Sequence, residues 1–418
     1  MNRRNFLAAA GLAATAPLYA RAGTPAPAGA DMKSLPTIKG LGGIEFYKND
    51  GVYLDSGSMH PVSVGSRATL DAYLADRMGD PRSTSYHQDP IRDRVLGNFA
   101  QMINADRSEV TLVQSTTAGE QLVLRALGLP AAGAHVVTDT MHFFGSFYLY
   151  EAMAKLGVDV TWVRPKNNRI DLDDIEAAVK KGTKLVAISA VSTFNGFQHD
   201  LKRVCEIAHA KGARVYADII HAAGCVPLDV KATGVDFAAC ASYKWLMGDF
   251  GLGFLYVRKD RLPELQHPVW GYYQLNAFQS HVYPFDPPGD DVADYGVPED
   301  ASGYFMWGTF SHMGIGLLDY SLDYIQKVGV PAIQAHAKPL TDHLKTELPK
   351  RGFELVTPME STAPLVTFAY KDAANRLRPK MKEAQVDITI SRNRFRFSPS
   401  VFNTMEDIDR AMHALGTA

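Results

Sequence analysis

The feature that most constrains the fold is a regular alternation of strand-like and helix-like segments between residues 109 and 258. The strand-like segments are short and apolar, and several helix-like segments end at a glycine. Strands that alternate with helices form βαβ units, which build a mainly parallel sheet covered on both faces. We therefore predict an α/β fold whose large domain has a mainly parallel seven-stranded sheet. The predicted strands are 109–115, 134–140, 159–164, 184–192, 213–218, 237–242 and 253–258.

The pattern changes after residue 310. Two long amphipathic helices are predicted there, short strands follow, and a last helix begins at Met405. This order indicates a smaller α+β domain, whereas the aromatic, proline-rich and acidic residues of 267–300 indicate a long loop. We predict a signal peptide at 1–22, a linker and N-terminal arm at 23–50, the large cofactor-binding domain at 51–310 and the small C-terminal domain at 311–418.

The first 22 residues form a separate segment. Arg3 and Arg4 precede an uncharged stretch rich in alanine, and Ala20-Arg21-Ala22 is a small-x-small site of the kind that signal peptidase cuts. The stretch is shorter than the ~20 apolar residues that a spanning helix needs. It is similar to a twin-arginine export signal, which predicts a periplasmic mature protein, delivered by the twin-arginine machinery and without a membrane span.

Charge and cysteine content narrow the classes of function. The formal net charge is -2 and the basic residues are scattered, which argues against a nucleic-acid partner. The three cysteines, Cys205, Cys225 and Cys240, show no C-x-x-C spacing. We therefore predict buried structural thiols and no metal site.

Polar residues follow the ends of five predicted strands. Ligands in open parallel sheets bind at the carboxyl ends of strands, so these residues are candidates for one site. Each has another interpretation when taken singly: an aspartate there favours a turn, a threonine before a helix caps it, and a lysine can extend along the sheet edge. Their occurrence at successive strand ends favours a shared site. The candidates are Thr116, Thr117, His142, Ser192, Thr193, Asn195, Asp218, His221 and Lys244.

With these residues in this order, the chain resembles the class V aminotransferase family, the fold-type I enzymes that depend on pyridoxal 5′-phosphate (PLP). The resemblance extends from "GVYLDSGSMHP" (51–61) to "RFSPSVFNTMEDIDR" (396–410). It implies the fold-type I architecture and a PLP cofactor. Within the family, the chain is most similar to isopenicillin N epimerase-like proteins.

The resemblance implies a role for each candidate around the cofactor ring. Lys244 would form a Schiff base with the cofactor aldehyde, because a desolvated lysine becomes a usable amine nucleophile. Asp218 would pair with the pyridine nitrogen and make the ring an electron sink. His142 would stack on the ring, and His221 would hydrogen-bond to its phenolic oxygen. Lys244, Asp218 and His142 are thus the predicted catalytic residues.

The resemblance also implies residues for the phosphate and for a second subunit. Thr116 and Thr117 lie at a predicted helix N-terminus and would bind the phosphate through hydroxyl and backbone N–H groups. Thr193 belongs to the cofactor site, where desulfurases carry an asparagine. Thr309, in "WGTF", matches a threonine that reaches the phosphate of the neighbouring subunit, which implies a homodimer with a shared active site.

Arg396 would hold the α-carboxylate of an amino-acid substrate, because a planar guanidinium binds a carboxylate bidentately. Arg394 and Arg392 lie on the same face of the predicted strand and could share this task. Desulfurases that form a persulfide carry a cysteine shortly before this arginine, whereas residues 372–395 contain none. The sequence therefore predicts an enzyme that does not form a persulfide. Tyr243 precedes Lys244 where desulfurases have histidine, and we expect it to shape the pocket.

The reaction type stays open at this point. Epimerisation, transamination, elimination and decarboxylation all begin by weakening one bond at the α-carbon of the substrate. An isopenicillin N epimerase-like reaction is the first interpretation. The alternatives are an exported aminotransferase or oxidative decarboxylase that modifies a pyoverdine-type siderophore peptide, and a binding protein that keeps the fold without catalysis. A dinucleotide-binding enzyme would need G-x-G-x-x-G after the first strand, where "STTAGEQ" stands instead.

Overall fold

The computed structural model describes residues 35–48, 50–80 and 90–418. The chain divides into a short unit, Met1–Thr37, and a compact unit, Ile38–Ala418. The fold described below is that of the compact unit. The signal peptide predicted at 1–22 and the first part of the predicted linker lie outside the described residues.

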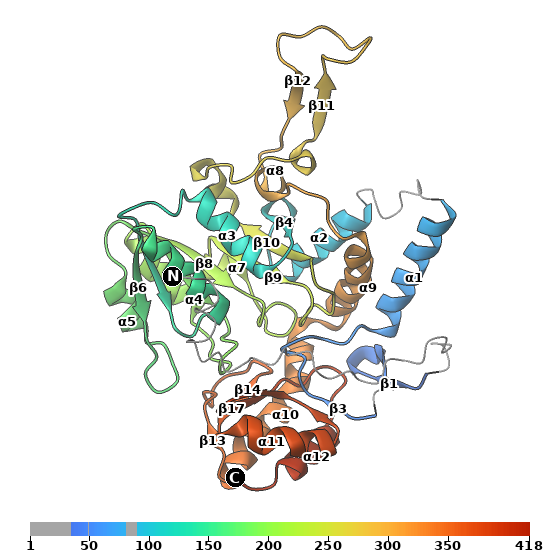
Figure 1. Ribbon diagram of the computed structural model, residues 1–418, viewed down its shortest axis with the longest axis vertical. Helices are drawn as coiled ribbons and strands as arrows, with labels where there is room; N and C mark the ends of the chain where they lie inside the picture. The colour runs from blue at the N-terminus through green and yellow to red at the C-terminus, as the bar shows by residue number, and fades with distance from the viewer. Residues whose placement is uncertain (1–34, 49, 81–89) are drawn as a thin grey trace, which may run out of the picture. The chain divides into compact units, whose positions relative to one another are not determined.

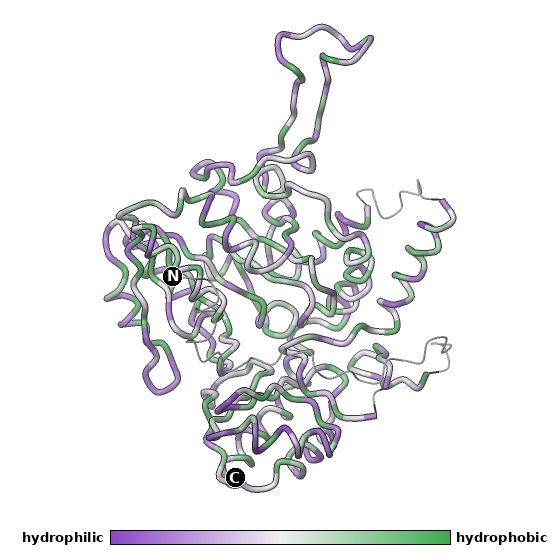
Figure 2. Tube along the Cα trace, in the orientation of Figure 1, coloured by the Kyte–Doolittle hydropathy of each residue, from purple (hydrophilic) through white to green (hydrophobic). Residues whose placement is uncertain are grey.

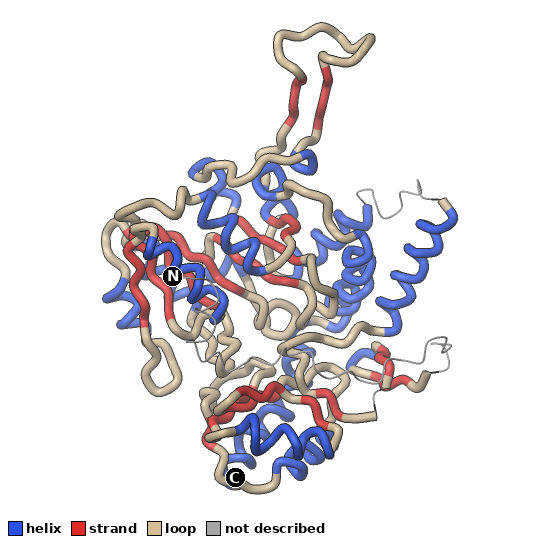
Figure 3. Tube along the Cα trace, viewed as in Figure 1, coloured by secondary structure: helices blue, strands red, loops and turns tan. Residues whose placement is uncertain are grey.

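A seven-stranded sheet forms the centre of the compact unit (Figures 1 and 3). Its strand order is β4-β10-β9-β8-β7-β5-β6. β10 runs antiparallel to both of its neighbours, and the other pairs are parallel. The predicted α/β fold with a mainly parallel seven-stranded sheet is confirmed. The strands are β4 Val110–Val113, β5 His135–Asp139, β6 Asp159–Val163, β7 Thr183–Ser189, β8 Arg214–Asp218, β9 Phe237–Ala241 and β10 Gly253–Val257.

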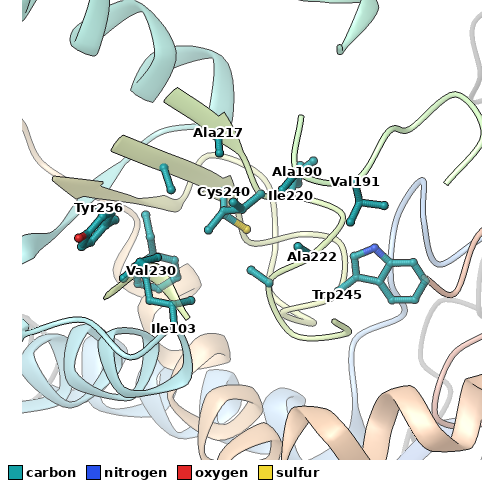
Figure 4. Packing of buried hydrophobic residues seen from close by; sticks show 14 of the residues in the cluster. Ile103, Ala190, Val191, Ala217, Ile220, Ala222, Val230, Cys240, Trp245 and Tyr256 are labelled. Carbon is teal, nitrogen blue, oxygen red and sulfur yellow. The ribbon is translucent and has the colours of Figure 1, made fainter. Parts of the chain in front are cut away.

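Both faces of this sheet are buried. Neighbouring strand residues belong to different hydrophobic clusters: Ala217 and Cys240 to one (Figure 4), Tyr216 and Ala239 to the other. Successive side chains of a strand point to opposite faces, so a sheet covered on both sides needs continuously apolar strands. The surrounding helices are α1 Val64–Gly79, α2 Pro90–Met102, α3 Thr116–Ala126, α4 Phe144–Lys155, α5 Leu172–Ala178, α6 Leu201–Ala210, α7 Val230–Thr233, α8 Ala301–Phe305 and α9 His312–Val328.

The C-terminal residues build a third hydrophobic cluster around an antiparallel sheet of order β13-β14-β17-β16. Leu344, Phe395 and Ile408 lie in this cluster, whereas Leu318 of α9 lies in a cluster of the large sheet. The domain limits predicted from the sequence stay a prediction. The elements are α10 Val330–Lys350, β13 Glu354–Leu355, β14 Val366–Ala369, α11 Ala373–Glu383, β15 Val386–Asp387, β16 Thr389–Ser391, β17 Arg394–Phe397 and α12 Met405–Leu415.

A short parallel pair joins distant parts of the chain. β3 (Val52–Tyr53) pairs with β15, and Asp55 forms an isolated bridge with Ser398. This pairing brings the segment that contains Asp55 next to Arg396. The remaining short elements are β1 Thr37–Lys39, β2 Glu45–Tyr47, and the 3₁₀ turns η2 Leu41–Gly43, η3 Arg107–Glu109, η4 Lys259–Glu264 and η5 Tyr272–Gln274.

The long loop predicted at 267–300 is wrong in part, because a hairpin interrupts it. β11 (Ala277–Ser280) pairs antiparallel with β12 (Ala293–Gly296), and the rings of Phe278 and Tyr295 lie 5.7 Å apart. The hairpin extends away from the large sheet, and hydrophobic and hydrophilic residues mix along it (Figures 1 and 2). Its strands are short and largely exposed, so the burial that makes other strands apolar is missing.

Among the described helices, none is long and apolar enough to cross a membrane.

The contact between α3 and β9 gives a testable prediction about stability. A Cβ atom at Gly119 of α3 would lie 2.7 Å from the Cβ of Ala239 in β9, whereas a Cβ at Gly97 of α2 would have open space. We expect Gly119→Ala to lower the free energy of unfolding by about 1–3 kcal/mol, because it overpacks this contact. The matched Gly97→Ala should raise it by roughly 0.5–1 kcal/mol. Urea unfolding of both variants checks this, and equal effects would contradict it.

Candidate active site

The structure brings four predicted residues together at the carboxyl ends of β5, β8 and β9. The Nζ atom of Lys244, which follows β9, lies 3.0 Å from Nε2 of His221. Asp218 ends β8 opposite Ala239 of β9, and the charges of Lys244 and of His142, which follows β5, both act on its carboxyl group. One acid, two imidazoles and one amine therefore share a buried region at the sheet edge.

Lys244 lies in the turn that connects β9 to the antiparallel β10. The hydroxyl of Ser242 donates to the carbonyl of Asp249 at 2.6 Å, and the N–H of Met247 donates to the carbonyl of Lys244 at 2.9 Å. The lysine side chain is buried, with 7% of the residue exposed. Burial, helped by the positive charge of Arg396, lowers the pKa of Lys244 to about 8. Near neutral pH a far larger share of this amine is therefore neutral and nucleophilic than in an exposed lysine.

The proton on His221 can be placed from its two neighbours. The indole N–H of Trp245 lies 3.3 Å from Nδ1 of His221, and an indole nitrogen can only donate. Nδ1 is therefore the acceptor. Burial and the charge of Lys244 hold the pKa of His221 well below its usual value, so the ring is neutral and its proton is on Nε2. That N–H points at Nζ of Lys244, and the amine accepts it whenever the amine is unprotonated.

Asp218 is a buried acid, and no cation among the described residues is in direct contact with its carboxyl group. Its Oδ1 atom accepts the backbone N–H of Ile220 at 2.9 Å. Burial raises the pKa of Asp218, although the charges of His142 and Lys244 act against this rise. A protonated heterocyclic nitrogen would supply the missing partner, and this fits the predicted role of Asp218 toward a pyridine ring.

His142 belongs to a buried hydrogen-bonded network whose acid the sequence did not reveal. Its Nδ1 lies 2.8 Å from Oγ of Ser189, and its Nε2 lies 3.1 Å from Oε1 of Glu120. The hydroxyls of Ser146 and Tyr150 also donate to this carboxylate, at 2.7 Å each. Glu120 lies on the buried face of α3, which is otherwise apolar apart from Gly119. A charged residue in that stripe was the signal that could have identified it.

Thr116 and Thr117 begin α3, as predicted. The hydroxyl of Thr116 accepts the N–H of Ala241 at 2.9 Å, which ties the start of α3 to the end of β9. Ser115 caps the helix by accepting the N–H of Ala118 at 3.1 Å, and Thr117 is exposed. The helix N-terminus and the free hydroxyl proton of Thr116 suit an anion, and binding of the phosphate there stays a prediction.

Thr193 and Arg396 contact each other. Nη1 of Arg396 donates to the carbonyl and the hydroxyl of Thr193, at 3.0 and 3.1 Å. Nη2 donates to the hydroxyls of Ser58 and Thr389, at 3.0 Å each, and lies 3.5 Å from Oδ1 of Asp55. Nε of Arg396 is buried and has no hydrogen-bond partner within the described residues. A substrate carboxylate fits this arginine, because it would supply an acceptor for that N–H.

The other predicted residues lie around this set. Ser192 and Asn195 hydrogen-bond to backbone carbonyls, of Met141 at 2.8 Å and of Asn168 at 2.9 Å, and so hold the loop after β7.

Arg394 and Arg392, the other two arginines considered for the substrate carboxylate, lie in different surroundings from Arg396. Arg394 stacks over the ring of Phe194 with 3.8 Å between Cζ and the ring centre, and Arg392 is exposed. Thr309 is exposed between α8 and α9, and its predicted contact with the phosphate of a neighbouring subunit stays a prediction.

Comparisons with known proteins agree with this arrangement. The model of the family "Aminotransferase class-V" matches residues 91–410. The chain belongs to the class V aminotransferase family. Over 315 residues it is 26% identical to an uncharacterized aminotransferase, YcbU, of Bacillus subtilis, covering 75% of this chain and 80% of the relative. It is 29% identical to a probable cysteine desulfurase of Methanothermobacter thermautotrophicus over 306 residues, 71% of this chain and 72% of the relative.

A solved structure shares the fold. The cystine C–S lyase C-DES, in a variant with glycine covalently linked to the PLP cofactor, is similar with a TM-score of 0.77 and 17% identity. The match covers 88% of this chain and 97% of that structure. Family and fold together make this class V protein a PLP-dependent enzyme. Lys244, Asp218, His221 and the start of α3 are the residues that would hold the cofactor.

The lowered pKa of Lys244 gives a prediction about cofactor binding. We expect the rate at which cofactor-free protein captures PLP to rise with pH around a midpoint near 8, because only the neutral amine reacts. Stopped-flow absorbance of the bound cofactor measures this rate. A midpoint close to the ordinary lysine value of 10.5 would contradict the assignment.

Two arginine variants provide the control. The charge of Arg396 lowers the pKa of Lys244, so Arg396→Gln should move the midpoint to higher pH. Arg394→Gln removes a neighbouring guanidinium that is stacked on Phe194 and should leave the midpoint close to that of the natural protein.

Proposed function

We propose that this enzyme acts at the α-carbon of an amino acid or an amino-acid-derived metabolite and carries no persulfide on its own cysteines. An isopenicillin N epimerase-like reaction is the first candidate within this proposal. The absence of a persulfide would distinguish this enzyme from relatives that are named cysteine desulfurases. The main observation that supports this proposal is the burial of all three cysteines.

All three cysteines of the chain are buried. Cys225 and Cys240 are each 1% exposed and Cys205 is 2% exposed. Burial raises the pKa of each thiol, so none offers the accessible thiolate that attacks a sulfur atom. Residues 372–395, where the family's desulfurases carry their cysteine, contain none. These features support an enzyme that relays no sulfur through its own cysteines.

The remaining site residues suit chemistry at an α-carbon. Bound PLP supplies an electron-poor ring that weakens a bond at the α-carbon of the substrate. Arg396 would bind the α-carboxylate and so orient the bond that breaks. The neutral amine of Lys244 would remove a proton from that carbon or return one, and the burial of Lys244 and His221 would keep water away from the exchange.

The assembly and location of the protein belong to this proposal. A homodimer is supported by a group of exposed large apolar side chains on and beside the β11–β12 hairpin, which would gain by burial in an interface. Periplasmic location after twin-arginine export is supported by the sequence of residues 1–22. The exposed apolar residues of this group are Trp270, Tyr272, Phe278, Val282, Tyr283, Phe285, Val292, Tyr295, Val297 and Trp307.

One experiment tests the absence of a persulfide. We expect holoenzyme incubated with L-cysteine to form no protein-bound persulfide, as measured by alkylation and intact mass. The triple variant Cys205→Ala, Cys225→Ala, Cys240→Ala should keep its activity on the true substrate, because no thiol takes part in turnover. A persulfide on any of the three, or activity that is lost while folding is kept, would refute the proposal.

The reaction type follows from a parallel measurement of products. The holoenzyme is incubated with amino acids and siderophore peptides in heavy water, and the products are followed by mass. Deuterium at the α-carbon together with inverted configuration, in a product of otherwise unchanged composition, identifies epimerisation. Loss of ammonia identifies transamination or elimination, and loss of carbon dioxide identifies the decarboxylase alternative.

A further inference from the structure

The buried network around Glu120 has an unusual balance of charge. Glu120 is 2% exposed, and it receives hydrogen bonds from Ser146, Tyr150 and His142. Of these partners within the described part of the chain, only His142 can carry a positive charge. A buried carboxylate without a cation is costly, so the network favours a charged imidazole at His142.

We propose that Glu120 is a positioning residue that keeps His142 doubly protonated, and that the imidazolium in turn keeps Asp218 ionised for the ring nitrogen of the cofactor. The inference deepens the proposed function and rests on it for the role of Asp218. Glu120 itself contacts His142, and no role in the reaction is assigned to it beyond this.

The hydrogen bonds place the first proton on His142. The hydroxyls of Ser146 and Tyr150 donate to Glu120, which leaves the carboxylate as an acceptor toward Nε2 of His142. Nε2 therefore carries a proton. Nδ1 faces the hydroxyl of Ser189 at 2.8 Å, and a hydroxyl can accept as readily as donate. The second proton thus has an acceptor as well.

The charges that face His142 favour the same state. Glu120 of α3, Asp139 of β5 and Asp218 of β8 are acids, and each raises the pKa of His142. Burial acts in the opposite direction, but the acids outweigh it and the pKa is raised overall. The rings of Tyr150 in α4 and Tyr216 in β8 lie 6.3 and 6.5 Å from the imidazole ring.

Asp218 lies opposite Ser189 in the pairing of β7 with β8, and the Ser189 hydroxyl contacts Nδ1 of His142, so the imidazole lies near this acid. Burial raises the pKa of Asp218, and the charge of His142 is the largest contribution that lowers it, ahead of the backbone N–H of Ile220 and the charge of Lys244. A neutral His142 would therefore shift Asp218 toward its protonated form. A protonated acid could no longer balance a positive ring nitrogen.

The test is ¹⁵N NMR of histidine-labelled holoenzyme, with the signals of His142 assigned from a His142→Gln variant. At pH 7 we expect both ring nitrogens of His142 to be protonated in the natural protein. In Glu120→Gln, which keeps the shape and removes the charge, the midpoint of His142 titration should fall by about one to three pH units. Tyr150→Phe keeps the carboxylate and should change the midpoint by less.

Each outcome decides. A His142 with one protonated nitrogen at pH 7 in the natural protein overturns the inference, and so does an unchanged midpoint in Glu120→Gln. If Glu120→Gln fails to fold by circular dichroism, the measurement on the natural protein decides alone, with Glu120→Asp expected to retain the doubly protonated ring. Absence of PLP on Lys244 would contradict the proposed function, whereas PLP on Lys244 beside a neutral His142 contradicts this inference alone.

Discussion

The burial of one amine at the edge of the large sheet is the constraint on which the site depends. Lys244 is held in the turn between β9 and the antiparallel β10, with its Nζ atom 3.0 Å from a neutral imidazole. A charged ammonium in such a place is unfavourable, so the surroundings favour the neutral, reactive form. The reversal of direction at β10 makes this possible, because it returns the chain immediately and leaves the turn beside the end of β8.

The groups around that amine differ in charge, and their charges suit the binding of PLP and of a substrate carboxylate. His221 is kept neutral by burial and by Lys244, whereas His142 is kept charged by Glu120 and its neighbouring acids. Two histidines with opposite protonation therefore flank one buried acid and one amine. Arg396 lies beyond them, paired with Asp55, and lowers the pKa of Lys244 from a distance. The same residue that would bind the substrate carboxylate thus also tunes the amine.

The sequence allowed much of this to be predicted, because parallel strands carry their signals locally. The seven strands were predicted from apolar, β-branched runs. The site residues Lys244, Asp218, His221 and His142 were predicted from their positions at the strand ends. A charged residue on the apolar face of α3 was a local signal for Glu120, but its partner was not predictable, because the contact between α3 and the loop after β5 joins distant parts of the chain. The hairpin within 267–300 was missed because its strands gain little burial, so their composition resembles that of a loop.

The contact between Arg396 and Thr193 was also beyond the sequence, since 203 positions separate the two residues. Contacts with the loop after β7, such as the Ser361 hydroxyl that donates to the carbonyl of Gly196 at 2.6 Å, show how the C-terminal residues reach the sheet edge.

The most direct test of the central claim is to reduce the holoenzyme with borohydride and map the modified peptide by mass. The account predicts a pyridoxyl group on the peptide that contains Lys244, and none on the same peptide from a Lys244→Ala variant. Attachment to another lysine, or no attachment in protein supplied with PLP, would contradict it.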